Sequence, residues 1–264
     1  MNTLLNHLTS GSDQQPAVLF LHGFMGSAHD WDDVMAGLET AYRCFAVDLP
    51  GHGGSTGLID TAYTMDGAAQ AIADLLDERG VEGCAVVGYS MGGRLALYFA
   101  IGFPERCRTL VLESASPGLA TAEERHARRA MDEARAVRLE TGDFENFLNE
   151  WYRQPLFASL ARHEGLTERM VERRLVNDPR ELARSLRGMS TGRQPSLWER
   201  LPGLRVSTCA IAGARDRKYV ELAGRMAALS PRVQTVVVEE AGHNIHAEQP
   251  RRFVELLRTF LKQP

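Results

Sequence analysis

The sequence predicts an α/β fold with a mostly parallel sheet flanked by helices. Through most of its 264 residues, short apolar runs alternate with helix-like stretches, as they do where helices connect parallel strands. A serine stands between two glycines directly after one of these runs. The alternation stops once, over a long polar stretch that begins before the middle of the chain. The length is sufficient for one sizeable core with an insertion.

Six apolar runs have the length and composition of buried strands. They are Ala17–Leu21, Cys44–Val47, Cys84–Val87, Thr109–Leu112, Thr208–Ala212 and Thr235–Val238. Helix-like stretches lie between most of the runs or follow the last one: Met65–Arg79, Gly92–Ile101, Val220–Leu229 and Pro250–Leu261. This order predicts parallel strands joined by helical crossovers.

The alternation is interrupted between Ser114 and Leu201, where no strand-like run occurs. This stretch predicts several amphipathic helices that break at glycine or proline. The predicted breaks are at Gly142, Pro155, Gly165 and Pro179. We interpret the stretch as a helical lid inserted after the sixth-strand position, Thr109–Leu112. The expected organisation is a core in two parts, residues 1–116 and 201–264, with a lid of residues 117–200.

Composition argues against several classes of partner. A formal net charge of −4 gives no reason to expect nucleic acid as a partner. No segment approaches the roughly 20 apolar residues that span a bilayer, and Met1–Pro16 lacks the pattern of a signal peptide. The four cysteines have no metal-ligand spacing and are typical of a reducing compartment. We therefore expect a cytoplasmic protein without membrane insertion or metal; the sequence predicts no particular oligomeric state.

The most informative motif is Gly88-Tyr89-Ser90-Met91-Gly92, which joins an apolar run to a helix-like stretch. Between a strand and a helix, this G-x-S-x-G pattern is typical of a nucleophile elbow. The glycines let neighbouring backbone approach without a Cβ clash. The turn presents the serine hydroxyl at a helix N-terminus, where the dipole and free N–H groups favour negative charge. Ser90 is therefore a candidate catalytic residue.

Two further residues have the positions expected of its partners. A serine hydroxyl becomes reactive when an imidazole accepts its proton and a buried carboxylate orients that imidazole. In this type of sheet the order is serine, acid, histidine, each beyond the carboxyl end of a strand. Asp216 and His243 follow the fifth and sixth apolar runs. The sequence predicts a Ser90–Asp216–His243 triad, with His246 as the alternative histidine.

An oxyanion hole requires two backbone N–H groups directed at one point. Met91, directly after the serine, is one candidate donor, and Phe24, in the loop after the first apolar run, is the other. In that loop we interpret His22 as a structural hydrogen-bonding residue. We interpret Asp48 and His52 as organisers of the glycine-rich turn after the second run.

The motifs in this order resemble the α/β-hydrolase superfamily over essentially the whole chain. Finer features are similar to one family within it, the 2-succinyl-6-hydroxy-2,4-cyclohexadiene-1-carboxylate synthases of menaquinone biosynthesis. These features are Gly93-Arg94, Ser116–Leu119, Trp151–Leu160, Gly213–Lys218 and Ala241–His246. The stretch Trp151–Leu160 is the most specific, because nothing in the fold requires it.

The resemblance implies a lyase that eliminates pyruvate from 2-succinyl-5-enolpyruvyl-6-hydroxy-3-cyclohexene-1-carboxylate, a small-molecule tricarboxylate, without a metal or an organic cofactor. In that reaction the triad is a general base and the oxyanion hole holds the developing charge. Three carboxylates require fixed cations. The matching motifs assign substrate binding to Tyr89, Arg94, Arg128, Trp151, Arg174 and Lys218.

Alternatives remain open at this point. Between Gly118 and Arg200 there are 15 arginines and 14 acidic residues, so an arginine in this stretch is equally compatible with a surface ion pair. The triad is also compatible with a hydrolase of esters, thioesters or C–C bonds that uses Ser90 as a covalent nucleophile. A third alternative is a non-catalytic binding protein, although such members usually lose a triad residue.

Overall fold

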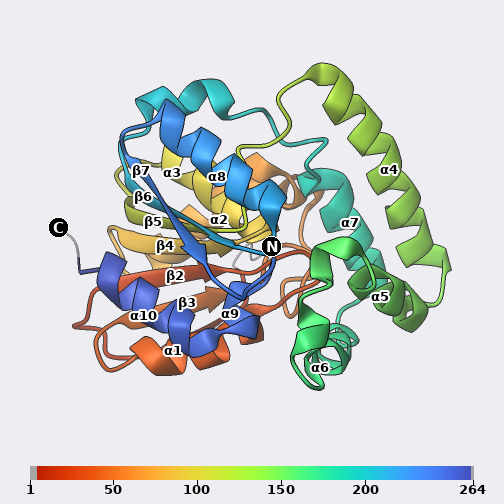
Figure 1. The fold of residues 1–264 in the computed structure, drawn as a ribbon, viewed down its shortest axis with the longest axis horizontal. Coiled ribbons are helices and arrows are strands. Elements are labelled where there is room, and N and C mark those ends of the chain that lie inside the picture. Colours follow the sequence, from red (N-terminus) through yellow and green to blue (C-terminus); the bar gives the residue numbers. More distant parts are fainter. Residues whose placement is uncertain (1–4, 263–264) are drawn as a thin grey trace.

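The computed structural model describes residues 5–262 as a seven-stranded sheet between two layers of helices (Figure 1). The strands are β1 (His7–Ser10), β2 (Ala17–Leu21), β3 (Arg43–Val47), β4 (Cys84–Tyr89), β5 (Cys107–Glu113), β6 (Ser207–Gly213) and β7 (Val233–Val238). Their order across the sheet is β1-β3-β2-β4-β5-β6-β7, with β1 antiparallel to β3 and the other pairs parallel.

The helices connect the strands and form the insertion. The α-helices are α1 (Asp32–Leu38), α2 (Met65–Glu78), α3 (Met91–Gly102), α4 (Ala122–Thr141), α5 (Phe144–Tyr152), α6 (Leu166–Arg174), α7 (Pro179–Met189), α8 (Arg217–Leu229), α9 (Ile245–Glu248) and α10 (Pro250–Phe260). Short 3-10 helices are η1 (Ala28–Trp31), η2 (Asp60–Tyr63), η3 (Pro155–Phe157), η4 (Leu160–Arg162) and η5 (Trp198–Gly203).

The six predicted strands and the four predicted helices are confirmed, with ends that move by a few residues. The sequence did not predict β1, because its four residues, His7–Ser10, are partly polar and form an edge strand with one neighbour. It also missed α1 and α9, whose seven and four residues are too short for a helical pattern. The predicted insertion follows the strand at Thr109–Leu112. This strand is β5, which is the fifth strand in the described part of the chain, although the sequence places it at the sixth-strand position.

Alternate residues of each strand bury opposite faces of the sheet. Leu19 and Leu21 of β2 pack toward α2 and α3, whereas Val18 and Phe20 pack toward α1 and α10. Burial of both faces explains why the strands are continuous apolar runs. Polar and catalytic side chains are therefore confined to the strand ends and the loops.

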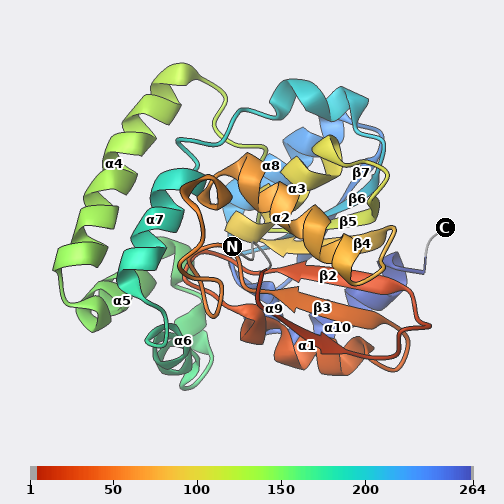
Figure 2. The same ribbon diagram turned by 180° about the vertical axis from the view of Figure 1, so that it is seen from behind.

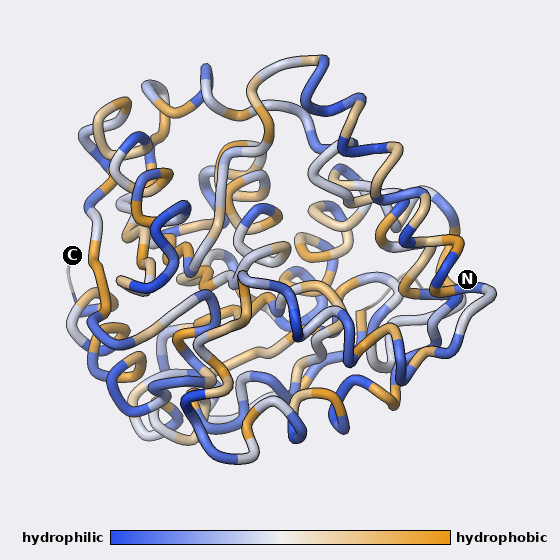
Figure 3. The backbone as a smooth tube through the Cα atoms, turned by 45° about the vertical axis from the view of Figure 1, so that its right-hand side comes forward, coloured by the Kyte–Doolittle hydropathy of each residue, from blue (hydrophilic) through white to orange (hydrophobic). Residues whose placement is uncertain are grey.

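The segment between β5 and β6 forms a separate helical group, α4–α7, at one end of the sheet (Figure 2). Its breaks occur where the sequence predicts them: Gly142 ends α4, Gly165 precedes α6 and Pro179 begins α7. Hydrophilic and hydrophobic residues alternate along the outer helices (Figure 3). The insertion has its own small core, which includes Leu139 and Leu182. Between residues 5 and 262, no helix has both the length and the apolar character needed to cross a membrane.

Candidate active site

Ser90 occupies a strained turn between β4 and α3. Its backbone has φ 51° and ψ −106°, a conformation rare for residues other than glycine. A Cβ on Gly88 would lie 2.5 Å from the Gly92 carbonyl oxygen, and one on Gly92 would lie 2.2 Å from that of Leu21. Both flanking glycines are therefore needed for the close approach of backbone around the serine.

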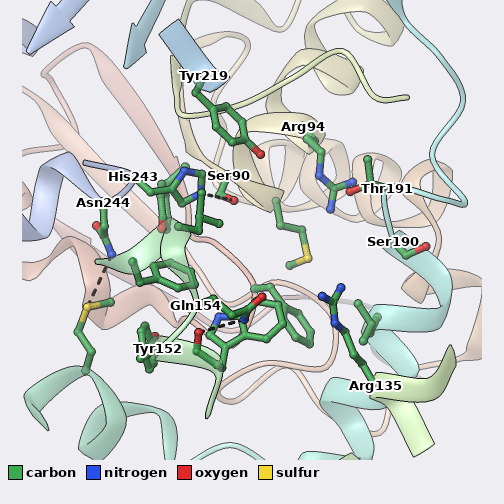
Figure 4. A pocket seen from close by; sticks show the side chains of 18 of the residues that line it. Ser90, Arg94, Arg135, Tyr152, Gln154, Ser190, Thr191, Tyr219, His243 and Asn244 are labelled. Atoms are coloured by element: carbon green, nitrogen blue, oxygen red, sulfur yellow. Dashed lines mark hydrogen bonds between the residues drawn. The ribbon is translucent and has the colours of Figure 1, made fainter. Parts of the chain in front are cut away.

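Ser90, His243 and Asp216 form one hydrogen-bonded chain. Figure 4 shows the hydrogen bond between Ser90 and His243. The Nε2 atom of His243 lies 3.1 Å from Ser90 Oγ, and its Nδ1 atom lies 2.6 Å from Asp216 Oδ2. With the Nδ1–H group donating to the carboxylate, Nε2 is free to accept the serine proton. The His243 ring is held by aromatic neighbours, including Tyr219 at 4.7 Å and Tyr89 at 5.4 Å between ring centroids.

The two predicted oxyanion donors, Phe24 and Met91, line the same cavity as Ser90. Neither the Phe24 nor the Met91 amide donates a hydrogen bond to any residue in the described range, so both remain available to a ligand. The loop of Phe24 is fixed by histidines: the Met25 amide donates to His52 Nε2 at 3.1 Å, and the Leu49 amide donates to His22 Nε2 at 3.0 Å. Burial lowers the pKa of both histidines, which keeps them neutral acceptors.

Asp48 holds the same region together. Its Oδ1 atom accepts the Ala28 amide at 2.6 Å, and its Oδ2 atom accepts the Gly54 amide at 2.8 Å. This carboxylate therefore joins the loop after β2 to the glycine-rich turn after β3, which is the organising role that the sequence predicts for it.

The cavity above Ser90 is lined by cations and by no carboxylate among the described residues. Its five basic residues are Arg94, Arg128, Arg135, Arg174 and Lys218. Four of them, all except Arg135, are predicted substrate ligands, and the other two predicted ligands, Tyr89 and Trp151, also line the cavity. The arrangement suits a small ligand that carries several negative charges.

Arg94 is a buried cation without a counter-ion. Its guanidinium donates to Gln194 Oε1 at 2.7 Å and to the Met189 carbonyl oxygen at 3.0 Å, and no described carboxylate pairs with it. Burial lowers its pKa to about 10. A bound anion would compensate this charge.

Two other arginines of the cavity share one acid. The buried Asp132 accepts from Arg128 Nε at 2.7 Å and from Arg135 Nη1 at 2.9 Å, all within α4. Asp132 is only 1% exposed. The pair of arginines with their shared acid keeps a net charge of plus one at the cavity wall.

Arg174 lines the cavity, but its charge is already neutralised. Nη1 and Nη2 make a bidentate ion pair with Asp30 at 2.6 and 2.8 Å, and Nε donates to the Tyr152 hydroxyl at 3.1 Å. Although burial disfavours the charged form, the ion pair with Asp30 raises the pKa of Arg174 above its usual value. In this conformation Arg174 connects the insertion to the loop after β2.

Several lining residues were not identified from the sequence. They are Arg135, Tyr152, Gln154, Phe157, Tyr219 and Asn244. A signal existed for some of them: Tyr152, Gln154 and Phe157 lie in the stretch Trp151–Leu160, and Arg135 is two helical turns after Arg128. His246, the alternative triad histidine, contacts Glu113 instead, at 2.7 Å from Nδ1 to Oε2.

Comparisons with known proteins agree with this fold. The family model described as the alpha/beta hydrolase fold matches residues 16–250. The structure titled MenH from S. aureus superimposes with a TM-score of 0.92 and 33% identity, and the match covers 99% of this chain and 98% of that one.

Curated relatives narrow the family. The chain is 36% identical over 259 residues to 2-succinyl-6-hydroxy-2,4-cyclohexadiene-1-carboxylate synthase of Serratia proteamaculans, with 97% of each chain covered. It is 34% identical over 258 residues to the chloroplastic protein PHYLLO of Arabidopsis thaliana, but it spans only 15% of the length of that protein. The chain therefore belongs to the 2-succinyl-6-hydroxy-2,4-cyclohexadiene-1-carboxylate synthase family of the α/β-hydrolase fold.

Proposed function

We propose that the chain is a lyase of menaquinone biosynthesis. It eliminates pyruvate from 2-succinyl-5-enolpyruvyl-6-hydroxy-3-cyclohexene-1-carboxylate to give 2-succinyl-6-hydroxy-2,4-cyclohexadiene-1-carboxylate. The observation that carries the proposal is a cavity beside the Ser90–His243–Asp216 chain that is lined by five cations and by no described carboxylate. Family membership gives the class of product, since relatives are named for its synthesis.

The charge of the cavity supports a substrate with three carboxylates. Asp132 and Asp30 neutralise two of the five cations, which leaves a net charge of plus three. The substrate carries a ring carboxylate, a succinyl carboxylate and an enolpyruvyl carboxylate. Arg94 and Lys218, which have no described carboxylate partner, are the cations most free to bind them.

The triad acts as a base in this reaction. His243 Nε2 accepts the Ser90 proton across the 3.1 Å hydrogen bond, and the serine oxygen then removes the acidic proton from the ring carbon that bears the succinyl group, next to the succinyl carbonyl. Asp216, 2.6 Å from Nδ1, stabilises the imidazolium that forms. After the ring proton is transferred, Ser90 is again a hydroxyl and no covalent bond to the enzyme has formed.

The negative charge moves from the ring carbon to the succinyl carbonyl oxygen. The unpaired amides of Phe24 and Met91 stabilise that oxyanion. When the charge returns from the carbonyl oxygen to the ring, the ring double bond shifts and the ring C–O bond to the enolpyruvyl group breaks. The leaving group takes the proton from the His243 imidazolium and tautomerises to pyruvate, so the elimination is balanced and redox-neutral.

The proposal includes a lid and a location. Residues 117–200 act as a lid, which is supported by the contribution of α4, α5 and α6 to the cavity wall through Arg128, Trp151 and Arg174. We expect the enzyme to act in the cytoplasm, because its four cysteines are unpaired thiols, as is usual in a reducing compartment.

The test is a coupled assay in which the preceding succinyl-transfer enzyme makes the substrate in situ. Pyruvate release and absorbance of the conjugated diene are followed with and without the purified chain. The proposal predicts that both signals rise together and well above the spontaneous rate. Pyruvate release at the spontaneous rate, from a chain that is folded by circular dichroism, would contradict it.

A second candidate function is hydrolysis, because the hydrogen bond between His243 and Ser90 is also the arrangement of a covalent serine nucleophile. An activated ester such as p-nitrophenyl acetate distinguishes the two. A stoichiometric burst of nitrophenol, with a Ser90-linked acyl group detected by mass spectrometry, favours the hydrolase. The lyase proposal predicts neither.

A further inference from the structure

We propose that Arg135 is a further substrate-binding residue and that it binds the terminal carboxylate of the succinyl chain. The inference rests on the proposed function, since it assigns a role within the same cavity. Arg135 lies on α4 within the insertion, and its side chain is 24% exposed and lines the cavity.

The position of Arg135 is fixed by its neighbours. Nη1 donates to the buried Asp132 at 2.9 Å, and the guanidinium carbon lies 5.5 Å from the centroid of the Trp151 ring. The ion pair with Asp132 fixes one edge of the planar Arg135 guanidinium, and the Trp151 ring covers one of its faces. Its Nε and Nη2 groups donate to no residue in the described range, so they remain available for a bidentate contact with a carboxylate.

Arg94 and Arg135 extend into the cavity from opposite sides (Figure 4). Ser190 and Thr191, which also line the cavity, lie beside them at one end. The cavity end between the two arginines therefore offers two guanidinium groups and the Thr191 hydroxyl, a set of hydrogen-bond donors that suits a carboxylate.

Ser90 and His243 lie at the other end of the cavity (Figure 4). The reacting ring carbon must lie at Ser90, and the succinyl carbonyl oxygen must lie at the amides of Phe24 and Met91. Two methylene groups separate that carbonyl from the terminal carboxylate. The terminal carboxylate is thus the one that a flexible chain carries away from the reacting centre, toward Arg94 and Arg135.

The experiment measures binding without turnover. The first ligand is 2-succinylbenzoate, a stable aromatic dicarboxylate with the ring carboxylate and the succinyl chain. The second is 2-butanoylbenzoate, in which a methyl group replaces the terminal carboxylate. Both are titrated calorimetrically into wild type, Arg135→Gln, Arg135→Lys and Arg138→Gln. Arg138 is a matched control on α4, because it also pairs with an acid and lies over an aromatic ring but does not line the cavity.

Arg135→Gln is expected to weaken binding of 2-succinylbenzoate by about tenfold or more and to leave 2-butanoylbenzoate within twofold. Arg135→Lys, which keeps the charge but loses the bidentate fork, is expected to fall between wild type and Arg135→Gln. Arg138→Gln is expected to bind both ligands as wild type does.

Three outcomes overturn the inference: no binding of 2-succinylbenzoate by wild type, unchanged binding by Arg135→Gln, or an equal loss for both ligands. These results are separate from the pyruvate assay. A chain that binds as expected but releases no pyruvate would refute the proposed function. A chain that releases pyruvate while Arg135→Gln binds normally would refute only the role of Arg135.

Discussion

Arg174 and Asp30 show how one residue pair joins two parts of the chain. Their side chains are 4% and 5% exposed, and 144 sequence positions separate them. Two charges buried at this depth are tolerated because each satisfies the other through a bidentate contact. Removal of one partner would leave the other charge buried and uncompensated.

Asp30→Asn is therefore expected to lower the free energy of unfolding by about 3–5 kcal/mol, since the Arg174 guanidinium loses its counter-ion while it stays buried. Urea denaturation of wild type and variant measures the difference. Asp33→Asn, on the same loop-to-helix segment but exposed, is the control and should change stability by less than about 0.5 kcal/mol. If Asp30→Asn lowers the free energy of unfolding by less than about 1 kcal/mol, the buried ion pair with Arg174 does not stabilise the fold as expected.

Among single residues, the triad could be predicted because its members occur in a fixed order along the chain. Ion-pair partners that are distant in the sequence could not be predicted. Ser90, Asp216 and His243 could be identified because a proton relay needs those residue types at successive strand ends. Arg174 could be identified as a cation of the insertion, but nothing near it in the sequence indicates Asp30. Asp132, in contrast, lies close to Arg128 and Arg135 in the sequence. Its burial, however, depends on tertiary packing and could not be predicted.

At the scale of elements, the loop that carries His243 is tied to the insertion by one carboxylate. Glu248, at the end of α9, has a side chain with no exposed area. It accepts the amides on both sides of His243, from Gly242 at 2.9 Å and Asn244 at 3.3 Å, and the hydroxyl of Ser159 at 2.9 Å. Ser159 belongs to the stretch Trp151–Leu160, so this contact gives a structural reason for part of that stretch.

Ser159→Ala is expected to lower the free energy of unfolding by about 1–3 kcal/mol, because the buried Glu248 carboxylate loses a donor. It should also lower kcat more than it raises KM, because Glu248 positions the His243 loop and does not line the cavity. Denaturation and the pyruvate assay measure the two effects. Ser12→Ala in the exposed loop after β1 is the control; equal behaviour of the two variants would contradict the expected role of Ser159.

Elements could be predicted where they are long or have a clear stop signal. Glycine and proline mark the ends of the helices in the insertion because the glycine backbone is costly to order in a helix and proline lacks the N–H group that a continuous helix needs. The edge strand β1 escaped prediction because one neighbour and a partly polar composition leave it without the pattern of a buried strand. The contact of Glu248 with Ser159 depends on how two distant loops meet, which no local pattern contains.

At the scale of the whole molecule, all four thiols are buried in the core. Burial raises the pKa of Cys44, Cys84 and Cys209 to about 12 and raises that of Cys107 well above its usual value. The thiolate is the reactive form, so an increase of pH to 8 leaves these groups almost entirely protonated.

Ellman's reagent is therefore expected to label none of the four thiols of the native protein at pH 8. It should label all four thiols of the denatured protein. If labelling is followed in increasing urea, the reaction should begin in the same range as loss of the circular dichroism signal. Rapid labelling of one thiol in the native state would show that this part of the core opens locally.

The overall architecture followed from two patterns in the sequence, alternation of strands with helices and its single interruption. Both patterns reflect burial of the two faces of a parallel sheet, which is why they predict the core well. The cavity is different, because α3, α4, α6 and α8 supply its cations from separate parts of the chain. Only their packing over the sheet brings those charges to one side of Ser90.

We propose that Ser90 drives the elimination of pyruvate as a base that passes its own proton to His243. The most direct measurement is pyruvate release by wild type and Ser90→Ala, at equal concentration and with the spontaneous rate subtracted. Ser90→Ala, folded and still able to bind 2-succinylbenzoate, is expected to lose about 10³-fold or more of kcat because no hydroxyl remains to take the ring proton. Release by Ser90→Ala within about tenfold of wild type would contradict it.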